Sequence, residues 1–187
     1  PGRLEARKGM LDAVRLLEKL PKMGFVTRLT FAGAIGLEQF KQDLIAEIQS
    51  ASLQEKVSMH GMLTQAQLVY QYHQSDICFF PSYQEMGFSR TPLEAMACGC
   101  LVISYGNEGS NEIIEHRKTG FLVDEGKVED AAHLIKEMIF DPALVYKVRE
   151  HARRLIEDRY SLSQYIDQIE QVLINHVNRF GSLLDGD

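Results

Sequence analysis

Apolar runs of strand length alternate with segments of helical periodicity along most of the chain, and this alternation limits the possible folds most strongly. The runs that predict strands are residues 29–32, 57–60, 76–80, 101–104 and 121–123. Strands that alternate with helices form βαβ units and a parallel sheet. The expected fold is therefore α/β, a Rossmann-like three-layer parallel sheet with helices on both faces.

Capping patterns predict where several helices begin. Thr64 and Gln67 have the spacing of a capping box, in which each side chain bonds the backbone N–H of the other residue. Ser161 starts a second pattern of the same kind. We expect Thr91 to begin the helix after the third strand, and Asn111 to begin a short helix after the fourth.

Length and charge exclude several classes of protein. The chain has 187 residues, and we divide it into a nucleotide-sugar-binding domain, residues 1–160, and a C-terminal helix and tail, residues 161–187. A net charge of -6 argues against nucleic-acid binding through a general basic surface. The three cysteines give no disulfide framework, and no apolar run reaches the roughly 18 residues that span a bilayer. Residues 1–8 are too polar for a signal peptide, so the expected location is cytoplasmic.

Residues 81–100 carry the clearest functional pattern. They connect a buried strand to a helix, and ligands of open α/β sheets bind at the carboxyl ends of the strands. The first backbone N–H groups of a helix have no partner inside the helix and can bind an anion. The carboxylates of Glu85 and Glu94 lie beside this predicted anion site. Together they favour a ligand that is rich in phosphate and hydroxyl groups, such as a sugar nucleotide.

Several segments in a fixed order carry a resemblance to a known family. They are residues 2–3, 8–9, 31–33, 57–61, 76–82, 85–99 and 120–123. Their order and spacing resemble the C-terminal, donor-binding half of GT-B-fold glycosyltransferases of the retaining family-4 type (glycosyl transferases group 1). The resemblance implies transfer of a hexosyl group from an NDP-sugar, with its anomeric configuration kept, to an unknown acceptor.

The resemblance also implies roles for individual residues. Arg3 and Lys8 match the pair that contacts the donor diphosphate, and Glu85 matches the acid near the reacting sugar carbon. These are the expected catalytic residues. Glu94 matches the acid that binds the ribose hydroxyls. The other expected substrate-binding residues are His60, Gly61, Gly87, Phe88, Ser89, Arg90, Thr91 and Leu93.

Several of these residues have a simpler structural interpretation. Glu94 also fits the third position of a capping box that begins at Thr91. Arg3 and Lys8 also fit mobile surface charges, and Glu85 fits a solvated acid in a loop. His60 also fits an ordinary residue at the end of a strand. Eight residues separate Glu85 from Glu94 where the family usually has seven, so the family alignment can also place Met86 at the position of the first acid.

The resemblance implies partners as well. The donor is an NDP-sugar, no cofactor or metal is expected, and Cys98-Gly-Cys100 has no second cysteine pair with which to form a metal site. The acceptor would be held by an N-terminal domain of the same protein, which also allows peripheral membrane association through that half. The tail over residues 165–180 has a broad apolar stripe that could pack either on that domain or on this one. Without the N-terminal domain, we expect little transfer activity.

Two other functions remain open from the sequence. A GT-B-fold sugar-nucleotide epimerase would use the same diphosphate site but would also need acid and base groups at the sugar ring. A non-catalytic Rossmann-like interaction module would not need to bind nucleotides at all. Binding of a nucleoside diphosphate separates the module from the two enzymes.

Overall fold

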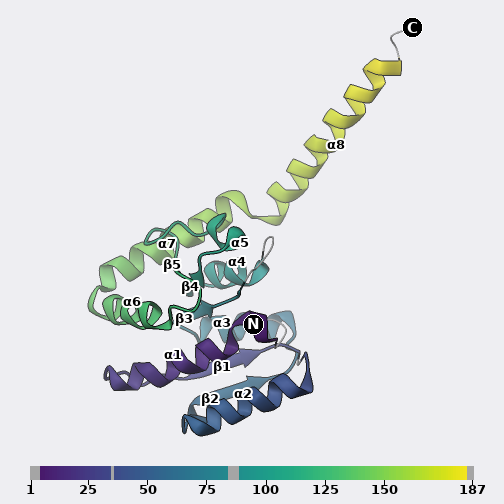
Figure 1. Cartoon of the computed structure of the whole chain (residues 1–187). Coiled ribbons are helices and arrows are strands. Elements are labelled where there is room, and N and C mark those ends of the chain that lie inside the picture. Colours follow the sequence, from purple (N-terminus) through teal and green to yellow (C-terminus); the bar gives the residue numbers. More distant parts are fainter. Residues whose placement is uncertain (1–4, 35, 84–88, 185–187) are drawn as a thin grey trace.

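The chain forms parallel strands with helices packed around them, and a long C-terminal helix extends away from this body (Figure 1). The structure is a computed structural model and describes residues 5–34, 36–83 and 89–184. The strands are β1 (Leu29–Ala32), β2 (Val57–His60), β3 (Ile77–Phe80), β4 (Leu101–Tyr105) and β5 (Phe121–Val123). The helices are η1 (Ala6–Lys8), α1 (Met10–Lys22), α2 (Glu38–Ser50), η2 (Gln54–Lys56), α3 (Gln65–His73), α4 (Arg90–Ala97), α5 (Glu108–Asn111), α6 (Val128–Phe140), α7 (Pro142–Arg159) and α8 (Leu162–Leu184).

All the predicted strands are present, and every pairing between them is parallel, as expected. They form two hydrogen-bonded sheets where the sequence led us to expect one. One sheet has two strands in the order β1-β2, with Leu29 opposite Val57. The other has three strands in the order β3-β4-β5. Within the described residues, β1 and β3 are therefore not paired with each other.

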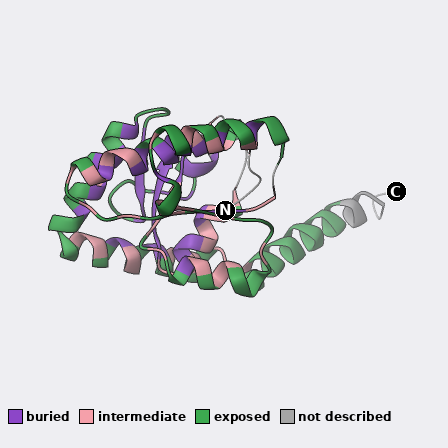
Figure 2. Ribbon diagram, turned by 90° about the horizontal axis from the view of Figure 1, so that it is seen from below, coloured by how far each residue is buried: buried purple, intermediate pink, exposed green. Residues whose placement is uncertain are grey.

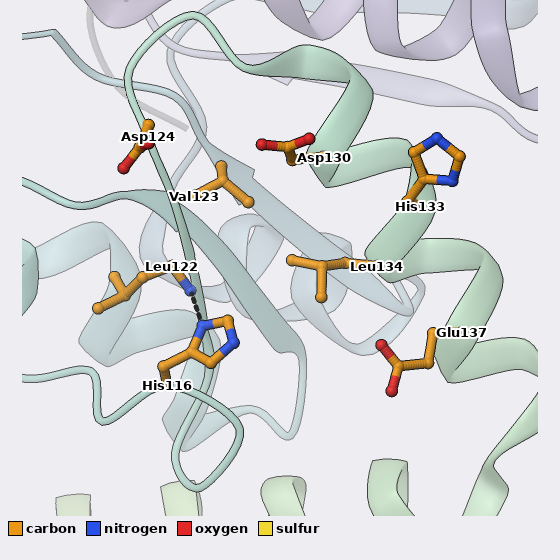
Figure 3. Close-up of a pocket in the computed structure, with 8 residues that line it drawn as sticks. All are labelled: His116, Leu122, Val123, Asp124, Asp130, His133, Leu134 and Glu137. Atoms are coloured by element: carbon orange, nitrogen blue, oxygen red, sulfur yellow. Dashed lines mark hydrogen bonds between the residues drawn. The ribbon is translucent and has the colours of Figure 1, made fainter.

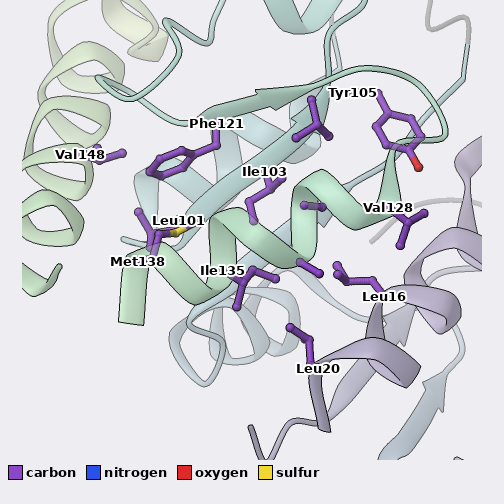
Figure 4. Close-up of a cluster of buried hydrophobic side chains, with 13 residues drawn as sticks. Leu16, Leu20, Leu101, Ile103, Tyr105, Phe121, Val128, Ile135, Met138 and Val148 are labelled. Carbon is purple, nitrogen blue, oxygen red and sulfur yellow. The ribbon is translucent and has the colours of Figure 1, made fainter. Parts of the chain in front are cut away.

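Side chains on β4 alternate between two cores, as the pleat of a strand requires. Leu101, Ile103 and Tyr105 face a core that includes side chains of α1 and α6 (Figure 4). Val102 faces a second core, with side chains of α3, α4 and α7. Helices thus cover both faces of this sheet, which confirms the three-layer arrangement.

The two predicted helix starts at Thr91 and Asn111 are wrong. Helix α4 begins at Arg90, with Ser89 as its N-cap, so Thr91 is its second residue. Pro92 fits this register because an N–H in the first turn has no partner inside the helix. The short helix α5 ends at Asn111; its N-cap is Asn107, whose side chain accepts a hydrogen bond from the backbone N–H of Ser110. By contrast, the capping box that begins at Thr64 is formed as predicted.

Helix α8 leaves the body of the domain, and its predicted apolar stripe is exposed (Figure 2). The exposed members are Tyr165, Ile166, Ile169, Val172, Leu173 and Val177, with relative exposures from 41% to 67%. The stripe therefore does not pack on this domain's own sheets. No helix in the described ranges is both long and apolar enough to cross a bilayer.

Candidate functional site

The segment before α1 is fixed against the carboxyl end of β3. The backbone N–H of Tyr83 donates to the carbonyl of Arg7 at 2.8 Å. Gly9 has a positive φ of 64°, and a Cβ added there would lie 2.8 Å from the carbonyl carbon of Pro81. The Nζ atom of Lys8 lies 5.6 Å from the centroid of the Phe80 ring. These contacts place Lys8 beside the turn that leads from β3 towards α4.

A buried carboxylate holds the same parts together. Asp12 of α1 is 3% exposed and accepts hydrogen bonds from the hydroxyl groups of Tyr83 and Tyr105, the latter at 2.7 Å. Arg15 donates to the other carboxylate oxygen at 3.0 Å. Burial, with the nearby Asp12, raises the pKa of both tyrosines, so their hydroxyl groups stay protonated as donors. Asp12 therefore links α1 to the residues that follow β3 and to the last residue of β4.

This cluster could not be predicted from the sequence because its members are far apart in the chain. Asp12 and Tyr105 are 93 residues apart, and no short motif joins them. The available signal was local: Asp12 lies between the apolar residues Met10 and Ala13, at helical spacing from Leu16. A carboxylate in such a position needs buried hydrogen-bond donors, and hydroxyl groups at the ends of neighbouring strands can supply them.

Glu94 lies on α4, half-buried, and a tyrosine holds its carboxylate. The hydroxyl of Tyr72, a buried residue of α3, donates to Oε2 of Glu94 at 3.2 Å. Burial, together with nearby acidic groups that include Glu94, raises the pKa of Tyr72, which keeps this donor protonated. Glu94 is the fifth residue of α4 and not its third, so the alternative reading as part of a capping box is wrong.

The N-terminus of α4 has the features of an anion site. Its N-cap, Ser89, makes no side-chain hydrogen bond to the helix, and the first turn contains no acidic residue. Arg90 is exposed, while Thr91 and Leu93 are half-buried. Early backbone N–H groups and the helix dipole favour an anion at such an end.

His60 ends β2 and Gly61 follows it, on the sheet that does not lead into α4. They lie at the carboxyl end of β2 and are exposed, and their carbonyl oxygens accept hydrogen bonds from the N–H of Gly33 at 3.3 and 3.1 Å. They lie at the end of the two-stranded sheet β1-β2, whereas Lys8 lies beside β3 of the other sheet. Their predicted role stays a prediction.

Four of the predicted site residues lie outside the described residues. They are Arg3, Glu85, Gly87 and Phe88. In the part of the chain that the structure describes, Lys8 lies beside the end of β3, and Glu94 lies on α4, where Tyr72 binds its carboxylate. The roles of the four other residues stay predictions.

The cysteines after α4 serve the fold. Cys98 caps the C-terminus of the helix, and Cys100 is buried, with its Sγ donating to the carbonyl of Tyr72 at 2.9 Å. Burial raises the pKa of Cys100 to about 12 and also raises that of Cys98, so neither thiol is a ready metal ligand. Among residues 5–34, 36–83 and 89–184, no group of His, Cys, Asp and Glu side chains could hold a metal ion.

A hollow of about 380 Å³ lies between β5 and α6, away from the residues described so far (Figure 3). Nδ1 of His116 accepts a hydrogen bond from the backbone N–H of Leu122 at 3.0 Å. Glu137 forms an ion pair with Arg117, which lowers the pKa of the carboxylate. Two of the hollow's polar groups are thus already bonded within the chain, and β4 separates the hollow from β3. It contributes nothing to the site around Lys8 and Glu94.

Comparison with known proteins agrees with this arrangement. The family model described as "Glycosyl transferases group 1" matches residues 1–162. D-inositol 3-phosphate glycosyltransferase of an Arthrobacter species is 31% identical over 147 residues, which cover 76% of this chain and 34% of that protein.

Solved structures show the same fold. HepE of Anabaena, determined in complex with UDP, has a TM-score of 0.84 at 23% identity and matches 93% of this chain and 48% of its own. The C-terminal domain of the group 1 glycosyl transferase LpcC of Francisella tularensis has a TM-score of 0.77 at 24% identity, covering 87% of this chain and 84% of that one. The chain thus spans a third to a half of the length of the Arthrobacter and Anabaena proteins and has the fold of the C-terminal half of a GT-B enzyme. It belongs to the glycosyl transferases group 1 family.

Proposed function

We propose that this chain is the donor-binding domain of a retaining glycosyltransferase that moves a hexosyl group from an NDP-sugar to an acceptor. The observation that carries the proposal is the position of Lys8, beside the carboxyl end of β3 and the turn towards α4. The complexes of HepE with UDP and with UDP-glucose support a nucleotide sugar as the ligand of this fold. Family membership supports transfer of a sugar as the reaction.

The proposed chemistry is electrostatic. When the sugar leaves, negative charge develops on the diphosphate, and groups fixed in advance near that charge lower the barrier. Lys8 and the N-terminus of α4 would supply positive potential, and Arg3 is proposed to add a second cation. Because these groups supply the charge, the proposal requires no metal. Glu85 is proposed to bind hydroxyl groups of the transferred sugar.

Glu94 would bind the other end of the donor. A carboxylate that accepts hydrogen bonds from two ribose hydroxyls makes charge-assisted bonds, which are stronger than neutral ones. The hydrogen bond from Tyr72 occupies Oε2 and limits the rotation of the side chain. Its fixed orientation would leave the other carboxylate oxygen for the ribose.

Replacing Lys8 by alanine tests the proposal. We expect this change to weaken UDP binding by about tenfold, since about 1.4 kcal/mol corresponds to a factor of ten and a bond to a charged group contributes about that much or more. Binding of uridine, which carries no phosphate, should be unchanged. Isothermal titration calorimetry at low and high salt measures both ligands, and added salt should reduce the difference.

Lys147→Ala is the matched control for this experiment. Lys147 is exposed on α7, so its removal changes the net charge by the same amount away from the site. UDP binding should be unaffected by this control. Equal weakening of UDP and uridine by Lys8→Ala, or no weakening of either, would show that Lys8 is an ordinary surface charge.

We also propose that α8 packs on an acceptor-binding domain of the same protein. The exposed stripe from Tyr165 to Val177 supports this, since large exposed apolar patches mark interaction surfaces. Val172→Asp should change the stability of this chain by less than about 0.5 kcal/mol, because Val172 is 67% exposed here. In a longer protein that includes the acceptor domain, the same change should lower the melting temperature by several degrees.

Asn178→Asp adds the same charge to α8 away from this stripe and should have little effect in either protein. Differential scanning calorimetry of both proteins makes the comparison. An unchanged melting temperature of the longer protein carrying Val172→Asp would contradict the proposed contact.

A further inference from the structure

The turn after β3 holds the segment around Lys8 at two points. Before Lys8, the carbonyl of Arg7 accepts a hydrogen bond from the backbone N–H of Tyr83 at 2.8 Å. After Lys8, Gly9 packs so closely on Pro81 that an added Cβ would lie 2.8 Å from the carbonyl carbon of that proline. The position of the Lys8 backbone is therefore set by this turn.

Side chains from other parts of the chain fix the turn in place. The carboxylate of Asp12 accepts a hydrogen bond from the hydroxyl of Tyr83, and the ring of this tyrosine packs edge-on against Tyr105, with 5.3 Å between the ring centroids. The side-chain amide of Asn107 donates to the carbonyl of Ser82 at 2.9 Å. Ser82 is fully buried and Asp12 is 3% exposed, so water has little access to either bond.

We propose that Asp12 is a positioning residue for the donor diphosphate and acts through Tyr83, which holds the cation of Lys8 in place. This role rests on the function proposed above, in which Lys8 binds the diphosphate. A cation that is fixed before the ligand arrives needs no reorganisation when the anion binds. Asp12 itself would not contact the donor, because its carboxylate is buried and already bonded within the chain.

Two tyrosines that share one oxygen of Asp12 provide a matched comparison. Both hydroxyl groups donate to Oδ2, that of Tyr83 from the turn after β3 and that of Tyr105 from the last residue of β4. Tyr83 also bonds the carbonyl next to Lys8, whereas Tyr105 belongs to a strand that pairs with β3 and β5 through its backbone. Removing either hydroxyl costs Asp12 one donor, but we expect the loss to reach Lys8 from Tyr83 alone.

Titration calorimetry of Tyr83→Phe and Tyr105→Phe with UDP and with uridine tests this inference. We expect Tyr83→Phe to weaken UDP binding by about threefold, less than the roughly tenfold loss expected for Lys8→Ala, because the cation is displaced and not removed. Binding of uridine should be unchanged. Tyr105→Phe should leave the binding of both ligands unchanged, although the melting temperatures of the two variants should fall by similar amounts.

A double variant shows whether Tyr83 acts through Lys8. In a chain that already carries Lys8→Ala, Tyr83→Phe should weaken UDP binding no further, because the group that it positions is missing. Equal weakening by Tyr83→Phe with and without Lys8 would overturn the inference, since the hydroxyl would then act on the nucleotide by another route.

The single variants can also overturn it. Equal weakening of UDP by Tyr83→Phe and Tyr105→Phe, or weakening of uridine as well, would show that Asp12 supports the fold in general. If UDP binding depended on Lys8 but not on the hydroxyl of Tyr83, the positioning role would be wrong and the proposed function would stand. If UDP binding did not depend on Lys8, the proposed role of Lys8 would fail first and the role of Asp12 with it.

Discussion

Gly9→Ala should destabilise the domain by about 2–5 kcal/mol, one of the largest effects that a single methyl group can have here. Part of the cost is backbone strain, because the φ of 64° is left-handed and costs an alanine about 1–2 kcal/mol. The rest is overlap, since the added Cβ would lie 2.8 Å from the carbonyl carbon and 2.9 Å from the Cβ of Pro81. Pro81 follows β3 directly and cannot move without disturbing that strand.

Gly99→Ala is the matched control. Gly99 has a φ of 80°, but a Cβ added there meets no atom within 4 Å. We therefore expect only the backbone cost of about 1–2 kcal/mol. Urea unfolding of both variants gives the two free energies of unfolding, and their difference isolates the contact with Pro81. Equal losses of stability would contradict the close packing of Gly9 against the end of β3.

The regular elements could be predicted from the sequence because their signals are local. The strand runs depend on neighbouring residues only, and these predictions are confirmed. The capping box at Thr64 is equally local. The start of α4 was misplaced because Pro92 fits any position of a first helical turn, and the choice between Ser89 and Thr91 depends on the path of the chain before the helix.

The parts that could not be predicted depend on long-range packing. The hydrogen bonds from Tyr83 and Tyr105 to Asp12 join residues more than 70 positions apart. The partner of Glu94 is Tyr72, on another helix. The spacing of apolar residues predicts which side chains are buried, but it does not predict which buried hydroxyl group donates a hydrogen bond to which carboxylate. The separation of β1 from β3 is likewise a property of strand order, which apolar runs alone do not determine.

Glu94→Ala should weaken UDP binding by roughly 10- to 150-fold, the equivalent of about 1.5–3 kcal/mol for hydrogen bonds to a charged group. Its effect on stability should be small. Glu94 is not part of an N-terminal cap, and the hydroxyl of Tyr72 keeps the carbonyl of Thr91 as an acceptor at 3.4 Å. Calorimetric titration with UDP and urea unfolding of the same protein samples separate the two effects.

The ribose hydroxyls provide the stricter test of Glu94. A UDP analogue that lacks both ribose hydroxyls should bind the unchanged chain weakly, and Glu94→Ala should weaken it no further, because the groups that Glu94 would contact are already missing. Glu115→Ala, which removes an exposed carboxylate beyond α5, should leave the binding of both ligands unchanged. If Glu94→Ala weakened UDP and its deoxygenated analogue by the same factor, the carboxylate would act on the nucleotide through general charge or through the shape of α4. The assignment of Glu94 to the ribose would then be wrong, even if the chain still bound UDP.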